Sequence, residues 1–306
     1  MQRWRFHIVW SVLSLATPLL FGGDTRIGLE RKEAFQVRHG TLAVAILEAH
    51  QITIAIDSRI TIERVGRSNE VHDGSEKVVT LSSNLAFFYT GAGVFDSPAF
   101  TISLPDTARA LAAEWQDQKR TIQLESFVAA FKERITTNFS RLTLADIRHL
   151  HLGALKWGHS NVFTAVFAGR DWDASLKLFR VVCGSSLDTN RVPNDARLSF
   201  DVTEDKRTGS RSFMFFGASK VFDLGMADPK SRMAAAFRQI RSSQTLLAEP
   251  ISAALLDLGL REFGDDPKSP VGYPIFVYVV DANSCRLTRK VNKDQAVPFD
   301  SRQQGR

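Results

Sequence analysis

Residues 39–46 read HGTLAVAI, and this stretch decides the fold because it begins a strand that is apolar along its length. Leucine, valine and isoleucine alternate with threonine and alanine, and this period of two is typical of a buried strand. A second β-rich run, QITIAIDSRITI at residues 51–62, follows a short polar break. Two such runs predict a hairpin. The first strand nevertheless begins at a Gly-Thr step, about forty residues into the chain.

The segment ahead of this strand has a different character. Arg3 and Arg5 precede an uncharged stretch, HIVWSVLSLATPLLFGG, at residues 7–23. A basic start followed by an apolar run has the shape of a secretory signal, although no Ala-x-Ala cleavage site is present. We therefore expect residues 1–23 to be a signal peptide of an exported, periplasmic or secreted protein. The alternative is a cytoplasmic protein with a hydrophobic propeptide or a mis-assigned start. Residues 24–40 are polar and indicate a pro-segment or linker.

The composition is that of an ordinary globular protein, with 44% hydrophobic and 24% charged residues among 306. The net charge is +6, but no long basic run is present, so we expect no nucleic-acid partner. Cys183 and Cys285 lack metal-ligand spacing and indicate free thiols, with a single disulfide as the alternative in an exported chain. His149 and His151 have no evident third ligand, so we expect neither a metal nor a cofactor.

Strand and helix patterns alternate in groups rather than singly. Expected strands cover residues 41–49, 51–62, 77–81, 85–90, 161–167, 176–183, 212–216, 274–280 and 286–291, and expected helices cover residues 105–118, 124–142, 229–243 and 248–263. This order predicts an α+β fold in which two antiparallel sheets pack together and a helix pair covers each outer face, a four-layer αββα sandwich. The domain spans residues 41–291, and residues 292–306 form a polar tail.

The segments HGTLAVAI, ITIAIDSRIT, EKVVTL and FFYTGAG resemble the catalytic β-subunits of the 20S proteasome and their bacterial relatives, which are N-terminal nucleophile (Ntn) hydrolases. In that family a propeptide is removed after a glycine, and the exposed threonine becomes the nucleophile. Thr41 precedes Asp57 by 16 positions and Lys77 precedes Gly91 by 14, which are the family's intervals. Arg59 follows Asp57 by two positions, also as in the family. The resemblance therefore places a processing site at the Gly40-Thr41 bond.

The second half of the site resembles the family less closely. Family members carry a serine in a Gly-Ser-Gly turn and an Asp-x-x-Ser pair before a late strand. This sequence offers Ser219, in Gly217-Ala218-Ser219, for the first. It offers Asp266 and Ser269 for the second, with two extra residues before the next glycine. These three residues are candidates only through the resemblance.

The resemblance implies a chemistry for each matching residue. The hydroxyl of Thr41 would attack an amide carbonyl, and its free α-amine would act as the base. Lys77 would stabilise the alkoxide with Asp57 as its partner, Arg59 would hold the loops around that pair, and the Gly91 amide would receive the oxyanion. Taken singly, each of these residues is also compatible with a purely structural role.

The expected function is accordingly that of a threonine protease, a zymogen that matures by autocatalytic cleavage. Its substrates would be peptides or unfolded proteins, and family members usually form rings, so a homo-oligomer is expected. Contact with a membrane is expected only through the signal segment. Two alternatives stay open: a catalytically inactive structural or binding subunit, and an Ntn amidase that acts on a small-molecule amide.

Overall fold

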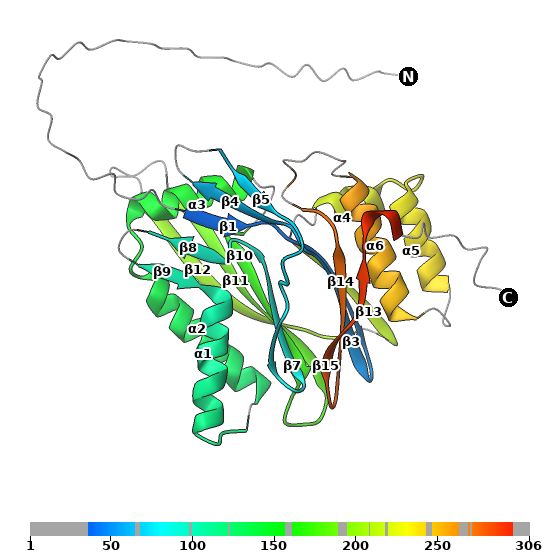
Figure 1. The fold of residues 1–306 in the computed structure, drawn as a ribbon, viewed down its shortest axis with the longest axis horizontal. Coiled ribbons are helices and arrows are strands. Elements are labelled where there is room, and N and C mark those ends of the chain that lie inside the picture. Colours follow the sequence, from blue (N-terminus) through cyan, green and yellow to red (C-terminus); the bar gives the residue numbers. More distant parts are fainter. Residues whose placement is uncertain are drawn as a thin grey trace, which may run out of the picture. The chain divides into compact units, whose positions relative to one another are not determined.

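The hairpin expected at the start of the domain is present. In a computed structural model of the chain, β2 (Leu42–Glu48) and β3 (Gln51–Asp57) pair antiparallel (Figure 1). The structure describes residues 36–64, 68–97, 100–121, 123–156, 161–188, 195–207, 209–217, 220–242, 247–262, 269 and 271–295. The expected signal segment lies outside these residues, and the expected tail is described only to residue 295.

The hairpin occupies the centre of a five-stranded antiparallel sheet with the order β13-β2-β3-β14-β15, which we call the β2 sheet. Its other strands are β13 (Arg211–Gly217), β14 (Ile275–Asp281) and β15 (Cys285–Val291). A second antiparallel sheet, the β10 sheet, has the order β12-β11-β10-β7-β6. Its strands are β6 (Val79–Ser82), β7 (Leu85–Gly91), β10 (Phe163–Arg170), β11 (Leu176–Asp188) and β12 (Asp195–Asp205).

The alternation of large and small side chains in β2 has a structural cause. Leu42, Val44 and Ile46 belong to a buried cluster with residues of α6 (Ala248–Glu262). Ala43 and Ala45 belong to another cluster, which the facing strands of the β2 and β10 sheets form. The large side chains fill the space toward the helix, and the small ones let the two sheets pack closely.

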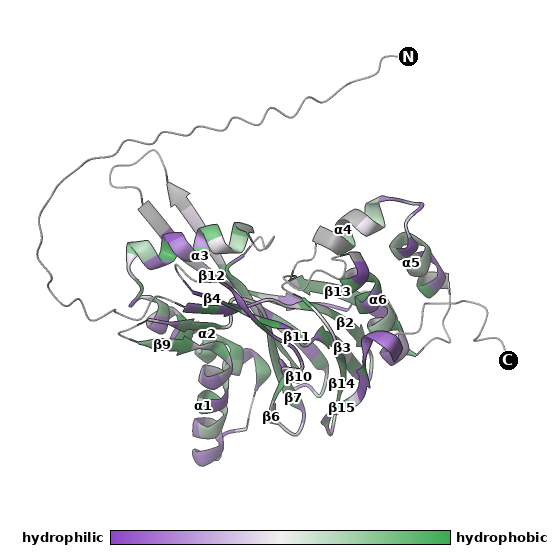
Figure 2. Ribbon diagram, turned by 45° about the horizontal axis from the view of Figure 1, so that its top comes forward, coloured by the Kyte–Doolittle hydropathy of each residue, from purple (hydrophilic) through white to green (hydrophobic). Residues whose placement is uncertain are grey.

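Helices lie beside both sheets (Figure 1). On the β2 sheet these are α4 (Lys220–Ala227), α5 (Arg232–Ser242) and α6, and near the β10 sheet they are α1 (Leu104–Asp117), α2 (Leu124–Phe139) and α3 (Leu144–Lys156). Figure 2 shows predominantly hydrophobic residues in strands β2, β10 and β14 and hydrophilic residues on α1 and α5. The buried apolar residues of α1 and α2 belong to one cluster with residues of the β10 sheet, and those of α6 belong to another with residues of the β2 sheet.

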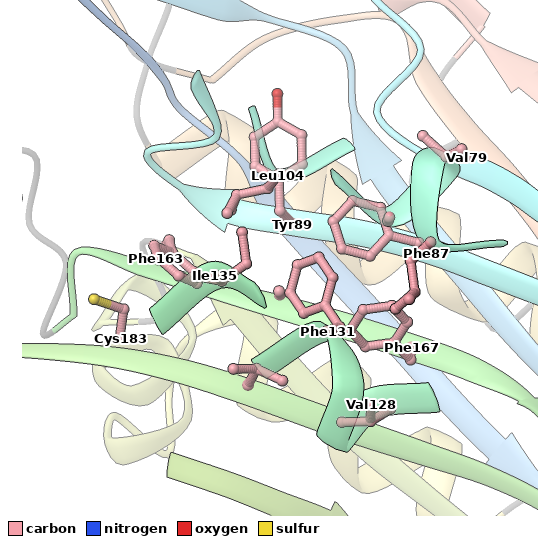
Figure 3. Close-up of a cluster of buried hydrophobic side chains, with 14 of the residues drawn as sticks. Val79, Phe87, Tyr89, Leu104, Val128, Phe131, Ile135, Phe163, Phe167 and Cys183 are labelled. Carbon is pink, nitrogen blue, oxygen red and sulfur yellow. The ribbon is translucent and has the colours of Figure 1, made fainter. Parts of the chain in front are cut away.

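Aromatic rings fill the core between α2 and the β10 sheet (Figure 3). The ring centroid of Phe131 on α2 lies 5.8 Å from that of Phe87 and 4.9 Å from that of Phe167. The rings of Phe87 and Phe167 are 5.0 Å apart on the neighbouring strands β7 and β10. Tilted and edge-to-face rings at these distances add to the stabilisation from apolar burial.

The described residues form three antiparallel sheets rather than the two that the sequence predicted. The additional sheet, which we call the β1 sheet, has the order β5-β4-β1-β8-β9. Its strands are β1 (Gln36–His39), β4 (Ile60–Arg64), β5 (Glu70–His72), β8 (Val94–Asp96) and β9 (Thr101–Ser103). The chain is thus an α+β protein. Residues 36–39, at the end of the expected pro-segment or linker, form the paired strand β1. Its Val37 side chain is fully buried.

The long hairpin excursion expected for residues 184–211 agrees with the structure, in which β11 and β12 pair antiparallel from Leu178 with Asp205 to Asp188 with Asp195. Helix α3 was not expected from the sequence. It carries His149 and His151, and Nδ1 of His151 lies 3.0 Å from Ser185 Oγ. Cys183 and Cys285 are free thiols, so the disulfide alternative is wrong. Among the described residues, no helix is both long enough and apolar enough to cross a membrane.

Candidate active site

The carboxylate of Asp57 is the centre of the candidate site. It stands at the end of β3 with no exposed surface. Its Oδ1 accepts hydrogen bonds from the Leu42 backbone N–H at 2.8 Å and from Lys77 Nζ at 2.8 Å. Its Oδ2 accepts from the backbone N–H groups of Arg59 and Gly272, each at 3.1 Å. The carboxylate therefore joins the start of β2, the end of β3 and the segment before β14.

The ammonium of Lys77 reaches two acceptors. Nζ lies 2.8 Å from Asp57 Oδ1 and 2.6 Å from the carbonyl oxygen of Gly40, and the side chain has no exposed surface. Burial lowers the pKa of Lys77 and raises the pKa of Asp57, and the attraction between the two charges opposes both shifts. A buried lysine with a lowered pKa and a single carboxylate partner is typical of a functional site.

Thr41 lies where the chain passes from the β1 sheet to the β2 sheet. Its side chain is fully buried, and its hydroxyl donates a hydrogen bond to the Gly40 carbonyl oxygen. The same oxygen accepts from Lys77 Nζ. Gly40 has a φ of 103°, in the region that favours glycine, so a side chain here would strain this step between the sheets. The hydroxyl, the peptide carbonyl and the ammonium thus form one contiguous group.

Gly217, at the end of β13, was not singled out from the sequence as a site residue in its own right. A Cβ atom at this position would lie 1.8 Å from the carbonyl oxygen of Thr41, and its φ is 88°. Only glycine lets β13 approach the backbone of Thr41 so closely. Its place in Gly217-Ala218-Ser219 pointed to the serine and gave no signal of this backbone approach.

Gly91 ends β7 and pairs with Phe163 of β10. It has a φ of 80°, and a Cβ atom here would lie 2.5 Å from the Val162 carbonyl oxygen. Among the described residues, the Gly40 carbonyl accepts hydrogen bonds from the Thr41 hydroxyl and from Lys77, and not from Gly91. Gly93, two residues on, donates its N–H to the carbonyl of Arg38 in β1 at 2.9 Å.

The guanidinium of Arg59 binds the surrounding loops, as the sequence predicted. Nε lies 2.6 Å from Asp73 Oδ1, and Nη1 donates to the Ser269 carbonyl oxygen at 3.3 Å. A Cβ atom on Gly272 would lie 2.5 Å from Arg59 Nε, so the guanidinium packs directly on that glycine. Arg59 therefore holds the segment that donates the Gly272 N–H to Asp57.

The hydroxyl of Ser269 bonds within its own segment. Its hydroxyl donates to the Val271 carbonyl at 3.0 Å and accepts from the Val271 N–H at 3.3 Å, so it shapes its own turn. Ser219 and Asp266 lie outside the described residues. Ser58, which the sequence analysis passed over, donates its N–H to the Gly272 carbonyl at 3.2 Å and accepts the Gly74 N–H at 3.1 Å.

Comparison with models of known families finds no match, and a search of curated proteins finds no significant relative.

Proposed function

We propose that the protein is a threonine-nucleophile amide hydrolase, a proteasome-like peptidase that activates itself by cutting its Gly40-Thr41 bond. One observation carries the proposal: the Gly40 carbonyl oxygen accepts from both the Thr41 hydroxyl and Lys77 Nζ, and Lys77 is paired with Asp57. In this proposal the β2 and β10 sheets and their helices correspond to the αββα layers of an Ntn hydrolase, and the β1 sheet is an addition to them.

Self-cleavage would begin at the Gly40 carbonyl. Lys77 polarises the C=O bond, and the Thr41 oxygen attacks the carbonyl carbon. The C–N bond breaks, the hydroxyl proton ends on the Thr41 nitrogen, and an ester links Gly40 to Oγ1. Water then hydrolyses the ester and leaves a carboxylate on Gly40 and a free α-amine on Thr41. Every group in these two steps belongs to the chain or to water.

The mature site would use the new chain end. The α-amine of Thr41, with a reference pKa of about 7.7–8.0, accepts the hydroxyl proton and later protonates the leaving amine. Lys77 lowers the pKa of that amine and stabilises the alkoxide by its charge. The Gly91 amide would receive the oxyanion, and Gly93, two residues on, donates its N–H to the Arg38 carbonyl of the pro-segment.

The inward position of Lys77 is the observation that favours an active enzyme over an inactive subunit. Its side chain has no exposed surface and ends between Asp57 and the candidate scissile bond. Burial of a lysine charge costs free energy even when the charge is paired, so a lysine with a packing role alone would be unfavourable at this position. Assembly into a homo-oligomeric ring and export through residues 1–23 are further parts of the proposal that rest on the resemblance alone.

Intact mass and N-terminal sequencing of the purified full-length protein test the proposal. We expect a mature chain that begins at Thr41, and we expect it to cleave peptides. A chain that begins upstream of Thr41 and releases no Thr41 terminus on incubation would leave the α-amine blocked. That result would contradict the proposed chemistry and favour the inactive binding subunit.

A further inference from the structure

Strand β1 occupies the middle of its sheet. It pairs with β4 through residues 36–39 and with β8 through residues 36–38, both antiparallel. In the described sheet, β4 and β8 pair with β1 and not with each other. Removal of β1 would leave two facing strand edges about 9–10 Å apart, twice the spacing of neighbouring strands. Such a gap accepts one extended chain and uses its backbone groups for binding.

The inner face of β1 carries one apolar and one polar side chain. Val37 is fully buried in the cluster that contains Phe95, its partner in β8. His39 is 2% exposed, and its Nε2 lies 3.6 Å from a carboxylate oxygen of Glu63 in β4. The Glu63 side chain is only 12% exposed, so an acidic residue in the place of His39 would meet a poorly hydrated like charge.

The outer face carries one pair of opposite charge. Arg38 Nη2 lies 3.6 Å from Asp96 Oδ2 of β8, with both side chains partly exposed. The register places Gln36 opposite Asp96, so Arg38 reaches Asp96 diagonally. Two acidic residues on the flanking strands thus face the two residues that precede Gly40.

We propose that peptide substrates replace β1 in the mature enzyme and that Glu63 and Asp96 select basic side chains two and three residues before the cut bond. This inference rests on the proposed function, because it takes Gly40 as the residue whose carbonyl is attacked. Val37 adds an apolar site at the fourth residue before the bond. The substrate class is therefore extended basic peptides with an apolar residue at that fourth position.

Peptide hydrolysis by the mature protein tests the inference. Acetyl-Val-Arg-His-Gly-aminomethylcoumarin repeats the chain's own sequence and is the reference substrate. Glutamate in place of arginine should lower kcat/KM about fivefold, as expected for a partly exposed pair. Glutamate in place of histidine should lower it about tenfold or more, because Glu63 is less exposed.

Two variants separate the sites. Asp96→Asn should remove the preference at the third residue and keep that at the second, and Glu63→Gln should do the reverse. Glu133→Gln on the exposed side of α2 removes a negative charge elsewhere. It should change neither the ratio of kcat/KM between the arginine and glutamate peptides nor that between the histidine and glutamate peptides. Equal rates for the basic and acidic peptides would overturn the inference while the proposed function stood. No hydrolysis of any peptide would instead contradict the proposed function.

Thermal unfolding of the full-length Thr41→Ala variant, which keeps β1 attached, gives a reading that needs no activity. His39→Glu should lower the Tm of this protein by several degrees, and Glu63→Lys in the same chain should recover part of the loss. The recovery would support the charge selection independently of catalysis. A Tm loss that Glu63→Lys does not reduce would overturn the role of Glu63.

Discussion

Lys77 Nζ and Asp57 Oδ1 lie 2.8 Å apart, and neither side chain has any exposed surface. The aspartate is further held by three backbone N–H groups from three separate segments. A buried ion pair is worth little net stability when its desolvation is counted, but loss of one partner is costly. Stability alone therefore gives little reason for the pair, and this agrees with the chemistry proposed at the neighbouring Gly40 carbonyl.

Lys77→Ala should abolish self-cleavage and also lower the free energy of unfolding by about 3–5 kcal/mol, because it leaves the Asp57 carboxylate buried without its counter-charge. Urea unfolding monitored by circular dichroism measures the second effect. Lys77→Met combined with Asp57→Asn should cost less than the sum of the two single changes. Arg109→Ala, which breaks an exposed pair with Asp106, is the control and should cost at most about 1 kcal/mol.

Thr41→Ala should leave the chain uncut and inactive, since the attacking oxygen is gone while the strand stays paired. Thr41→Ser keeps the hydroxyl without its methyl group and should retain part of both processing and peptide hydrolysis. Intact mass after timed incubation follows processing, and a fluorogenic peptide follows hydrolysis. Processing at full rate in Thr41→Ala would show that another group, or another protein, cuts the bond.

Gly217→Ala should disturb the position of Thr41, because its Cβ would lie 1.8 Å from the Thr41 carbonyl oxygen. We expect a loss of at least about 2 kcal/mol in unfolding free energy together with slower self-cleavage. Gly209→Ala is a matched control: its φ is also positive, at 76°, but no atom lies within 4 Å of the added Cβ. Equal losses in the two variants would mean that backbone strain alone, and not the approach to Thr41, accounts for the effect.

Self-cleavage and peptide hydrolysis should differ in their dependence on pH. Burial raises the pKa of Asp57, so the carboxylate takes up a proton, and cleavage slows, at a pH above the usual value of about 3.9. Burial lowers the pKa of Lys77, so its positive charge is lost below the usual value of about 10.4.

In the proposed mechanism the mature protein also needs a neutral α-amine, which the uncut chain lacks. Its activity should therefore fall on acidification at a higher pH than self-cleavage does. Rates of both reactions between pH 4 and pH 10 measure the difference, with buffers matched in ionic strength. Coincident acid limbs would exclude the α-amine as the base.

The sequence predicted the parts of the molecule that depend on local pattern. The alternation at residues 39–46 predicted the first strand of the β2–β3 hairpin. The intervals from Thr41 to Asp57 and from Lys77 to Gly91 selected four candidate residues. The structure brings three of them together: Thr41, Asp57 and Lys77. The interval from Thr41 to Asp57 predicts their proximity because a hairpin of fixed length returns the chain to the end of the sheet at which it began.

The rest depends on contacts between distant segments. The strand β1 has four residues of mixed polarity, and it is held by β4 and β8 rather than by its own propensity. The roles of Gly217 and Gly272 come from backbone approaches across the fold, which leave no local pattern. Ser269 had the expected spacing, yet its hydroxyl bonds within its own turn.

The place of β2 between β13 and β3 in its sheet has a consequence for the new chain end. The ends of protein chains ordinarily fray, since their last residues have few contacts and much conformational entropy to lose. Here the residue after Thr41 is paired with β13, and its N–H is bonded to Asp57. A terminus produced at Thr41 would have almost no freedom left to lose, so the amine and hydroxyl of one residue would stay aligned through every turnover.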